Sequence, residues 1–226
     1  MNTSYNDFLE RLKEERLSTR WSQLQMGQRL RMSQSHYSKA ELGTRRLTYY
    51  EIQFLCDTGV DVYYIFTGYR CKTEYNEFFR KCTYKELGCY LNMVCSVIEC
   101  MYINDTSRCQ DGLGKLIEFI QCVMRPYGNN KTAFYTLRCL MDYSQNKMAD
   151  LLKVDVKKLR DLENGKVLPD SEMMWSLYKT FGISFATLLE DAKGLGCEIG
   201  YLLELIDDER RYAVFENIKT LHSILK

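Results

Sequence analysis

Trp21-Ser22-Gln23-Leu24-Gln25-Met26-Gly27 opens a stretch that ends at Glu41-Leu42-Gly43. The pattern recurs 122 positions later, from Tyr143-Ser144-Gln145-Asn146-Lys147-Met148-Ala149 to Glu163-Asn164-Gly165. The two stretches align without a gap from Arg16 to Gly43 and from Arg138 to Gly165. The residues shared by both are Arg16, Ser22, Gln23, Met26, Leu30, Glu41 and Gly43, which recur as Arg138, Ser144, Gln145, Met148, Leu152, Glu163 and Gly165. The repeat predicts two copies of one small helical fold.

Each copy carries the signals of two short helices joined by a tight turn. In the first copy Ser22 precedes a helix and forms a capping box with Gln25, and Ser33 precedes the next helix. Gly43 is expected to end that helix in the left-handed conformation. In the second copy Ser144 and Asp155 are the expected caps. Leu24 and Leu30 are expected to point into the core.

Composition restricts the class of protein. The 226 residues are 46% hydrophobic and 27% charged, with a formal net charge of +1. This composition is typical of a soluble, helix-rich protein, and a nucleic-acid surface would have to be a local patch. The sequence shows no secretory signal and no apolar run long enough for a membrane span, so the cytoplasm is the expected location and no membrane partner is expected.

Ten cysteines are present, but none forms a C-x-x-C pair, and the two histidines, His36 and His222, are far apart. A zinc site would need closely spaced ligands, so we expect no metal and no cofactor. The cysteines are expected to be reduced and buried, with a redox sensor among the central ones as the alternative. His222 is expected on the surface of a terminal helix.

From Ser22-Gln23 to Glu41-Leu42-Gly43, and again from Ser144-Gln145 to Glu163-Asn164-Gly165, the chain resembles the Cro/phage-repressor (XRE-type) helix-turn-helix family. The resemblance covers residues 5–68 and 130–191. It implies an all-α fold with two lambda-repressor-like five-helix helix-turn-helix domains, a helical middle segment and a C-terminal helical tail. The domains are expected at residues 1–69, 70–128, 129–191 and 192–226.

In this family an arginine of the first helix often pairs with a glutamate that ends the third. The resemblance therefore implies two structural pairs, Arg16 with Glu41 and Arg138 with Glu163. The turn between the two central helices usually contains glycine, whereas Arg31 and Lys153 stand there. A left-handed conformation at these residues would cost about 1 kcal/mol.

The middle segment is expected to be helical. Leu87, Leu91, Val94, Ile98 and Met101 follow helical spacing, as do Leu113, Leu116, Ile117, Ile120 and Met124, with a turn at residues 104–107. It could be a spacer packed on both copies or a dimer surface.

The resemblance places the N-terminal end of the third helix in the major groove of DNA. In the first copy it implies base contacts by Gln34, Ser35 and Lys39, with His36 and Ser38 nearby. Glutamine suits adenine and lysine suits guanine. Gln23, Arg45 and Arg46 are expected to contact phosphates.

In the second copy the corresponding residues are Val156, Lys157 and Asp161, with Lys158 and Arg160 nearby, and Gln145 and Lys166 are expected near phosphates. Val156 could touch a thymine methyl group, and Asp161 could accept from cytosine. Several aspartates dilute the positive charge of this copy, which weakens the expectation of DNA contact there.

The sequence therefore predicts a sequence-specific regulator of transcription, bacterial or phage, that binds double-stranded DNA. The alternative is a DNA binder with one working copy, whose second copy serves dimerisation or binds a protein or effector. A role without DNA, such as blocking a partner protein, is a further alternative, and no catalytic residues are expected. A homodimer and an effector peptide or small molecule are left open as partners.

Overall fold

The computed structural model describes residues 4–102, 118–120 and 132–226, and every regular element among them is a helix. The expected turn at residues 104–107 and most of the second apolar stripe lie outside the described residues. The all-α fold class is confirmed. No helix in the described ranges is long and apolar enough to cross a membrane.

The first copy consists of α1 (Tyr5–Ser18), α2 (Gln23–Arg29), α3 (Gln34–Glu41), α4 (Tyr49–Asp57) and α5 (Val62–Thr67). The second copy consists of α9 (Ala133–Leu140), α10 (Gln145–Leu152), α11 (Val156–Glu163), α12 (Ser171–Phe181) and α13 (Phe185–Leu189). The remaining described helices are α6 (Thr73–Phe79), α7 (Tyr84–Tyr102), α14 (Ala192–Leu203) and α15 (Asp208–Leu225).

The expected capping residues are confirmed in both copies. Ser22 accepts a hydrogen bond from the Gln25 N–H and forms the capping box, and Ser33 caps α3. In the second copy Ser144 and Asp155 cap α10 and α11. Local side-chain chemistry therefore fixes the start of each central helix.

The left-handed backbone positions recur with the same spacing as the sequence repeat. Arg20 and Arg31 have φ values of 60° and 56°, and their counterparts Asp142 and Lys153 have 52° and 55°. The two glycines that follow α3 and α11 have 73° and 67°. The turn without glycine is thus present twice, and these left-handed positions recur with the spacing of the sequence pattern.

Leu24 does not point into the core. Its side chain is 48% exposed, whereas Leu30 is 1% exposed. Leu24 is the second residue of α2 and precedes the buried Met26 by two residues, which places the two side chains on nearly opposite faces of the helix.

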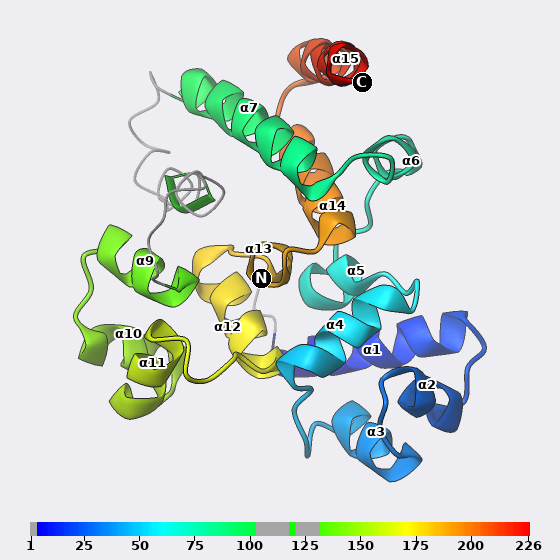
Figure 1. Cartoon of the computed structure of the whole chain (residues 1–226), viewed down its shortest axis with the longest axis vertical. Helices are drawn as coiled ribbons and strands as arrows, with labels where there is room; N and C mark the ends of the chain where they lie inside the picture. The colour runs from blue at the N-terminus through cyan, green and yellow to red at the C-terminus, as the bar shows by residue number, and fades with distance from the viewer. Residues whose placement is uncertain (1–3, 103–117, 121–131) are drawn as a thin grey trace.

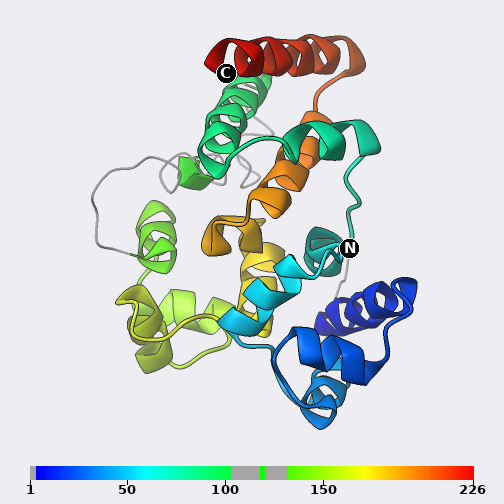
Figure 2. The same cartoon turned by 45° about the vertical axis from the view of Figure 1, so that its right-hand side comes forward.

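The middle segment and the tail pack on each other to form a helical cap, made of α6, α7, α14 and α15. Helix α14 contacts α6 and α7, and α7 contacts α15. Figure 1 shows these helices at one end of the molecule, with α1–α3 at the opposite end and α9–α11 to one side. Figure 2 shows the same order from another direction. The middle segment is therefore a partner of the tail.

The cysteines differ in their environment, which corrects the expectation that all are buried. Cys82, Cys95 and Cys197 are buried, while Cys89, Cys100 and Cys139 are exposed. All of the cysteines in the described ranges are free thiols, and residues 109 and 122 lie outside those ranges.

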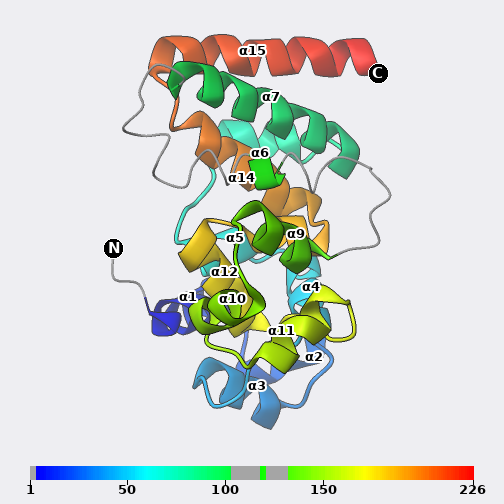
Figure 3. The ribbon, with the colours of Figure 1, turned by 90° about the vertical axis from the view of Figure 1, so that its left-hand side faces the viewer.

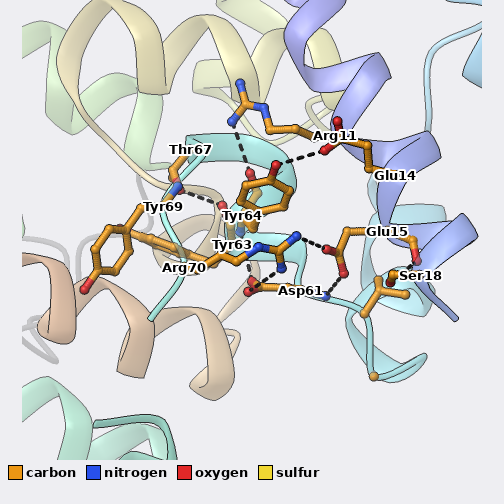
Figure 4. A network of polar contacts seen from close by, with 12 residues as sticks. Arg11, Glu14, Glu15, Ser18, Asp61, Tyr63, Tyr64, Thr67, Tyr69 and Arg70 are labelled. Atoms are coloured by element: carbon orange, nitrogen blue, oxygen red, sulfur yellow. Dashed lines mark hydrogen bonds and ion pairs between the residues drawn. The ribbon is translucent and has the colours of Figure 1, made fainter. Parts of the chain in front are cut away.

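A polar network fixes the direction in which the chain leaves the first copy (Figure 4). Arg70, just after α5, donates to Glu15 of α1 at 2.6 Å and lies 3.6 Å from Asp61. The Glu15 carboxylate also accepts the Asp61 backbone N–H, and Arg70 stacks over the Tyr64 ring. Because the Glu15 side chain is only 6% exposed, these bonds hold the start of the cap against α1.

Candidate nucleic-acid interface

Helix α3 is held in place by a buried cluster of Arg16, Glu41 and Gln23. The Arg16 guanidinium donates to both Glu41 oxygens, at 2.7 and 3.1 Å, and to the Trp21 carbonyl at 2.9 Å. The Gln23 amide donates to Glu41 at 2.8 Å. Burial alone would raise the pKa of Glu41, but the hydrogen bonds from Arg16 and Gln23 outweigh it and lower that pKa.

The same cluster exists in the second copy. Arg138 donates from Nε to Glu163 and from Nη1 to the Tyr143 carbonyl at 3.1 Å. Gln145 donates its amide to Glu163 at 2.8 Å. The ion pairs that the sequence implies are confirmed in both copies. The side chains of Gln23 and Gln145 belong to these clusters and help to orient α3 and α11. Contact of the amino-terminal ends of α2 and α10 with phosphates stays a prediction.

The predicted base-contacting residues of α3 face outward. Gln34, Ser35, His36 and Lys39 are exposed, and Ser38 is half-buried. On the opposite face of α3, Tyr37 and Ala40 are 0% and 1% exposed and lie in the core of the first copy. The structure thus brings the polar residues together on a single free face. Contact of that face with bases stays a prediction.

The arginines near α3 are more engaged than the sequence suggests. Arg45 forms a forked ion pair with Glu51, at 2.9 and 2.5 Å. Arg46 forms a forked pair with Glu172 of α12, at 2.7 and 3.0 Å. Arg29 and Arg31 stack on Trp21 and Phe54. The assignment of Arg46 to DNA phosphate therefore competes with a contact between the two copies.

The outward face of α11 is chemically different from that of α3. Lys157 and Arg160 are exposed, as is Lys166 in the following loop. Val156 is half-buried against the core, and Lys158 lies 3.6 Å from Asp170 at the start of α12. Asp161 is also half-buried. Of the residues predicted to contact DNA in this copy, three cations are thus exposed and form no ion pair with the residues that the structure describes.

Apolar side chains interrupt the surface beside α11. Leu151, Val167 and Leu168 are 40%, 42% and 44% exposed. No sequence pattern singled out these residues, because isolated apolar residues in loops are common. Their position beside the cations gives the second copy a mixed surface. Leu42, at the end of α3, is likewise 72% exposed.

Figure 3 places α3 and α11 on the part of the molecule that lies away from α7 and α15. Helix α4 of the first copy and α12 of the second lie between α1–α3 and α9–α11 in Figure 1. The cap therefore leaves the outward faces of both α3 and α11 uncovered.

Comparison with known proteins identifies one of the two copies. A family model described as helix-turn-helix matches residues 134–188, which span almost all of α9–α13. This part of the chain is therefore similar to the helix-turn-helix family. The match does not include α1–α5, so it supports the family resemblance for the second copy alone. No curated protein and no solved structure matches the chain.

Proposed function

We propose that this chain is a sequence-specific regulator of transcription, bacterial or phage in origin, that binds double-stranded DNA through two helix-turn-helix units. Helices α3 and α11 act as recognition helices in the major groove, and bound protein blocks or recruits RNA polymerase. The cytoplasm is the compartment that this proposal requires. No catalytic step and no cofactor are part of it.

One observation carries the proposal. The polar face of α3 is held by an Arg16–Glu41–Gln23 cluster that matches, bond for bond, the cluster behind α11 in the unit recognised as helix-turn-helix. Gln34 and Lys39 lie on that face with their side chains exposed. A glutamine can bind adenine and a lysine can bind guanine by two hydrogen bonds each, which is the chemistry of direct base recognition.

A second candidate function is supported by the surface of α11. The exposed Val167 and Leu168 and the ion pair between Lys158 and Asp170 favour a protein surface over a phosphate-binding surface. In this alternative only α3 binds DNA, and the second unit binds a protein, a second copy of the chain or an effector.

The test compares DNA binding by three double variants. Gln34→Ala with Lys39→Ala removes the base contacts of α3 and is expected to weaken binding to selected DNA by about 30-fold, or about 2 kcal/mol. Lys157→Ala with Arg160→Ala removes two exposed cations of α11 and spares the Lys158–Asp170 pair. It is expected to lower the slope of log affinity against log salt by about 1 to 2. Lys81→Ala with Lys85→Ala removes two exposed cations of the cap as a control.

The duplex is first selected from a random pool with the intact chain, and affinity is then measured at several salt concentrations. An unchanged slope for the α11 variant would leave the one-unit alternative standing. If the α3 variant and the α11 variant both bind as well as the control, DNA binding by these helices is wrong.

A further inference from the structure

Ser171, the first residue of α12, is buried where the first and second copies meet. Ser171 is 0% exposed, and its hydroxyl lies 2.7 Å from the Tyr5 hydroxyl. The Leu47 backbone N–H donates to the Ser171 hydroxyl at 3.0 Å, and the Ser171 N–H donates to the Leu47 carbonyl at 2.9 Å. This reciprocal pair joins the loop after α3 to the start of α12.

An ion pair flanks this junction. Arg46 forms its forked pair with Glu172, donates to the Gly43 carbonyl, and lies 4.7 Å from the centre of the Tyr5 ring. The two side chains are 33% and 46% exposed, so the ion pair adds little to stability. Its effect is to orient the loop after α3 on the start of α12. We call Tyr5, Arg46, Leu47, Ser171 and Glu172 the latch. Its loop begins directly after α3, so the latch is connected to the recognition surface by only a few residues.

Helix α12 is shared by the cores of both copies. Met174 and Trp175 pack with the core of α1–α5, whereas Met173 and Leu177 pack with the core that contains α9–α11. From the neighbouring α13, Phe185 stacks on Phe66 at 4.8 Å. Because protein interiors are densely packed, a rotation of one copy against the other would disrupt both cores.

The consequence concerns the separation of α3 and α11. Each is attached to α12, one through the latch and the first core, the other through the second core and the Lys158–Asp170 pair. When two binding modules are rigidly linked, binding of the first raises the effective concentration of the second at its own site. This gain in affinity occurs only on DNA whose two half-sites match the fixed separation of the modules. One inserted base pair moves the far half of a DNA site by about 3.4 Å and turns it by about 35°.

We propose that α12 and the latch hold the two recognition helices at one spacing, so that a single chain binds a composite, non-palindromic DNA site that tolerates no change between its halves. This inference rests on the proposed function of both units. The halves differ because Gln34, Ser35 and Lys39 correspond to Val156, Lys157 and Asp161. Arg46, Ser171 and Glu172 are positioning residues, which set the spacing without touching bases.

The experiment uses the intact chain and a duplex selected from a random pool. Insertions of one to five base pairs, and of ten, are placed between the two halves that footprinting identifies. The wild type is expected to lose at least tenfold in affinity at every insertion. Glu172→Lys removes one contact of the latch and leaves the shared cores in place, so it is expected to lessen the loss at a one-base-pair insertion by at least threefold, while its affinity for each isolated half stays unchanged. Glu172→Gln keeps an oxygen for Arg46 and is expected to retain the strict spacing.

The outcomes separate the inference from the proposed function. If the wild type binds no duplex above background, the proposed function fails, and the inference fails with it. If only one half is protected and the α11 variant binds normally, the two-unit function fails. If both halves are protected but insertions change affinity less than threefold, the function stands and the fixed spacing is wrong. The fixed spacing is also wrong if a ten-base-pair insertion restores full affinity, because that result indicates a flexible connection.

Discussion

Replacing Glu41 with alanine is expected to lower the free energy of unfolding by about 3 to 5 kcal/mol. The side chains of Arg16 and Glu41 are 8% and 4% exposed, and both Glu41 oxygens accept hydrogen bonds. Alanine would leave the Arg16 charge buried without a counter-ion, and the Gln23 amide without its acceptor. The midpoint of urea unfolding, followed by far-ultraviolet circular dichroism, measures the effect.

Glu216→Ala is the matched control for this substitution. Glu216 accepts from Lys219 at 2.6 Å, a distance close to that of the Arg16–Glu41 pair, but the two side chains are 43% and 41% exposed. Its removal is expected to change stability by less than about 0.5 kcal/mol. The double variant Arg16→Met with Glu41→Leu is expected to recover much of the loss, since no charge is left stranded. Equal losses for Glu41→Ala and Glu216→Ala would show that the buried cluster does not stabilise the first copy.

The features that sequence predicted well are local. Ser22, Ser33, Ser144 and Asp155 cap their helices because a short polar side chain at that position accepts a backbone N–H two or three residues ahead. This chemistry needs no knowledge of the rest of the fold. The outward face of α3 is also predictable from a local pattern. Helical spacing places Tyr37 and Ala40 on one face of the helix and their polar neighbours on the other.

The features that sequence missed depend on contacts between distant residues. Arg46 is expected at a phosphate, and the structure shows that Glu172, 126 positions away, accepts two of its hydrogen bonds. His222 was expected at the surface, yet it is 7% exposed and bonded to Tyr90 at 3.1 Å. No periodicity in the chain indicates that α15 returns to α7, or that α12 enters two cores. Residue spacing shows which face of a helix is apolar, but not which partner covers it.

The mixed character of the second copy follows from the same limit. Its helix-turn-helix fold is readable from sequence, and the family comparison identifies it. Two properties of α11 are visible only in the folded structure, where α12 lies beside it. Lys158 forms an ion pair with Asp170, and Val156 is half-buried. A recognisable fold therefore identifies the scaffold of α11, while its side chains decide what that scaffold binds.

The second large effect is expected at Glu198, in the middle of α14. This glutamate is 4% exposed, and its carboxylate accepts a hydrogen bond from the Ser184 hydroxyl. Burial raises the pKa of Glu198 from its ordinary value of 4.5 to about 7, although the Ser184 hydrogen bond partly offsets this. The Glu198 charge in turn helps to hold the pKa values of Tyr63, Tyr178, Tyr84 and Cys95 above their ordinary values.

The sign of the pH dependence follows from the raised pKa. As pH rises from about 4.5 to about 7, Glu198 loses its proton in the unfolded chain before it does so in the folded one. The folded state therefore loses stability over this window, by an amount on the order of 3 kcal/mol, and the penalty is constant at higher pH. Glu198→Gln carries no such charge. The stability of this variant relative to wild type is expected to rise by about that amount between pH 4.5 and pH 8.

Glu204→Gln, six residues further along the same segment, is the control with the opposite sign. Burial would raise the pKa of Glu204, but hydrogen bonds from Lys72 and Tyr75 outweigh it and lower that pKa. The stability from Glu204 is therefore present above the unfolded pKa and lost as pH falls, so Glu204→Gln should be destabilising near pH 7 and less so in acid. Urea unfolding of both variants and the wild type at half-unit pH steps separates the two groups. Parallel curves for Glu198→Gln and the wild type across pH 4.5 to 8 would mean that Glu198 titrates normally and that its surroundings are hydrated.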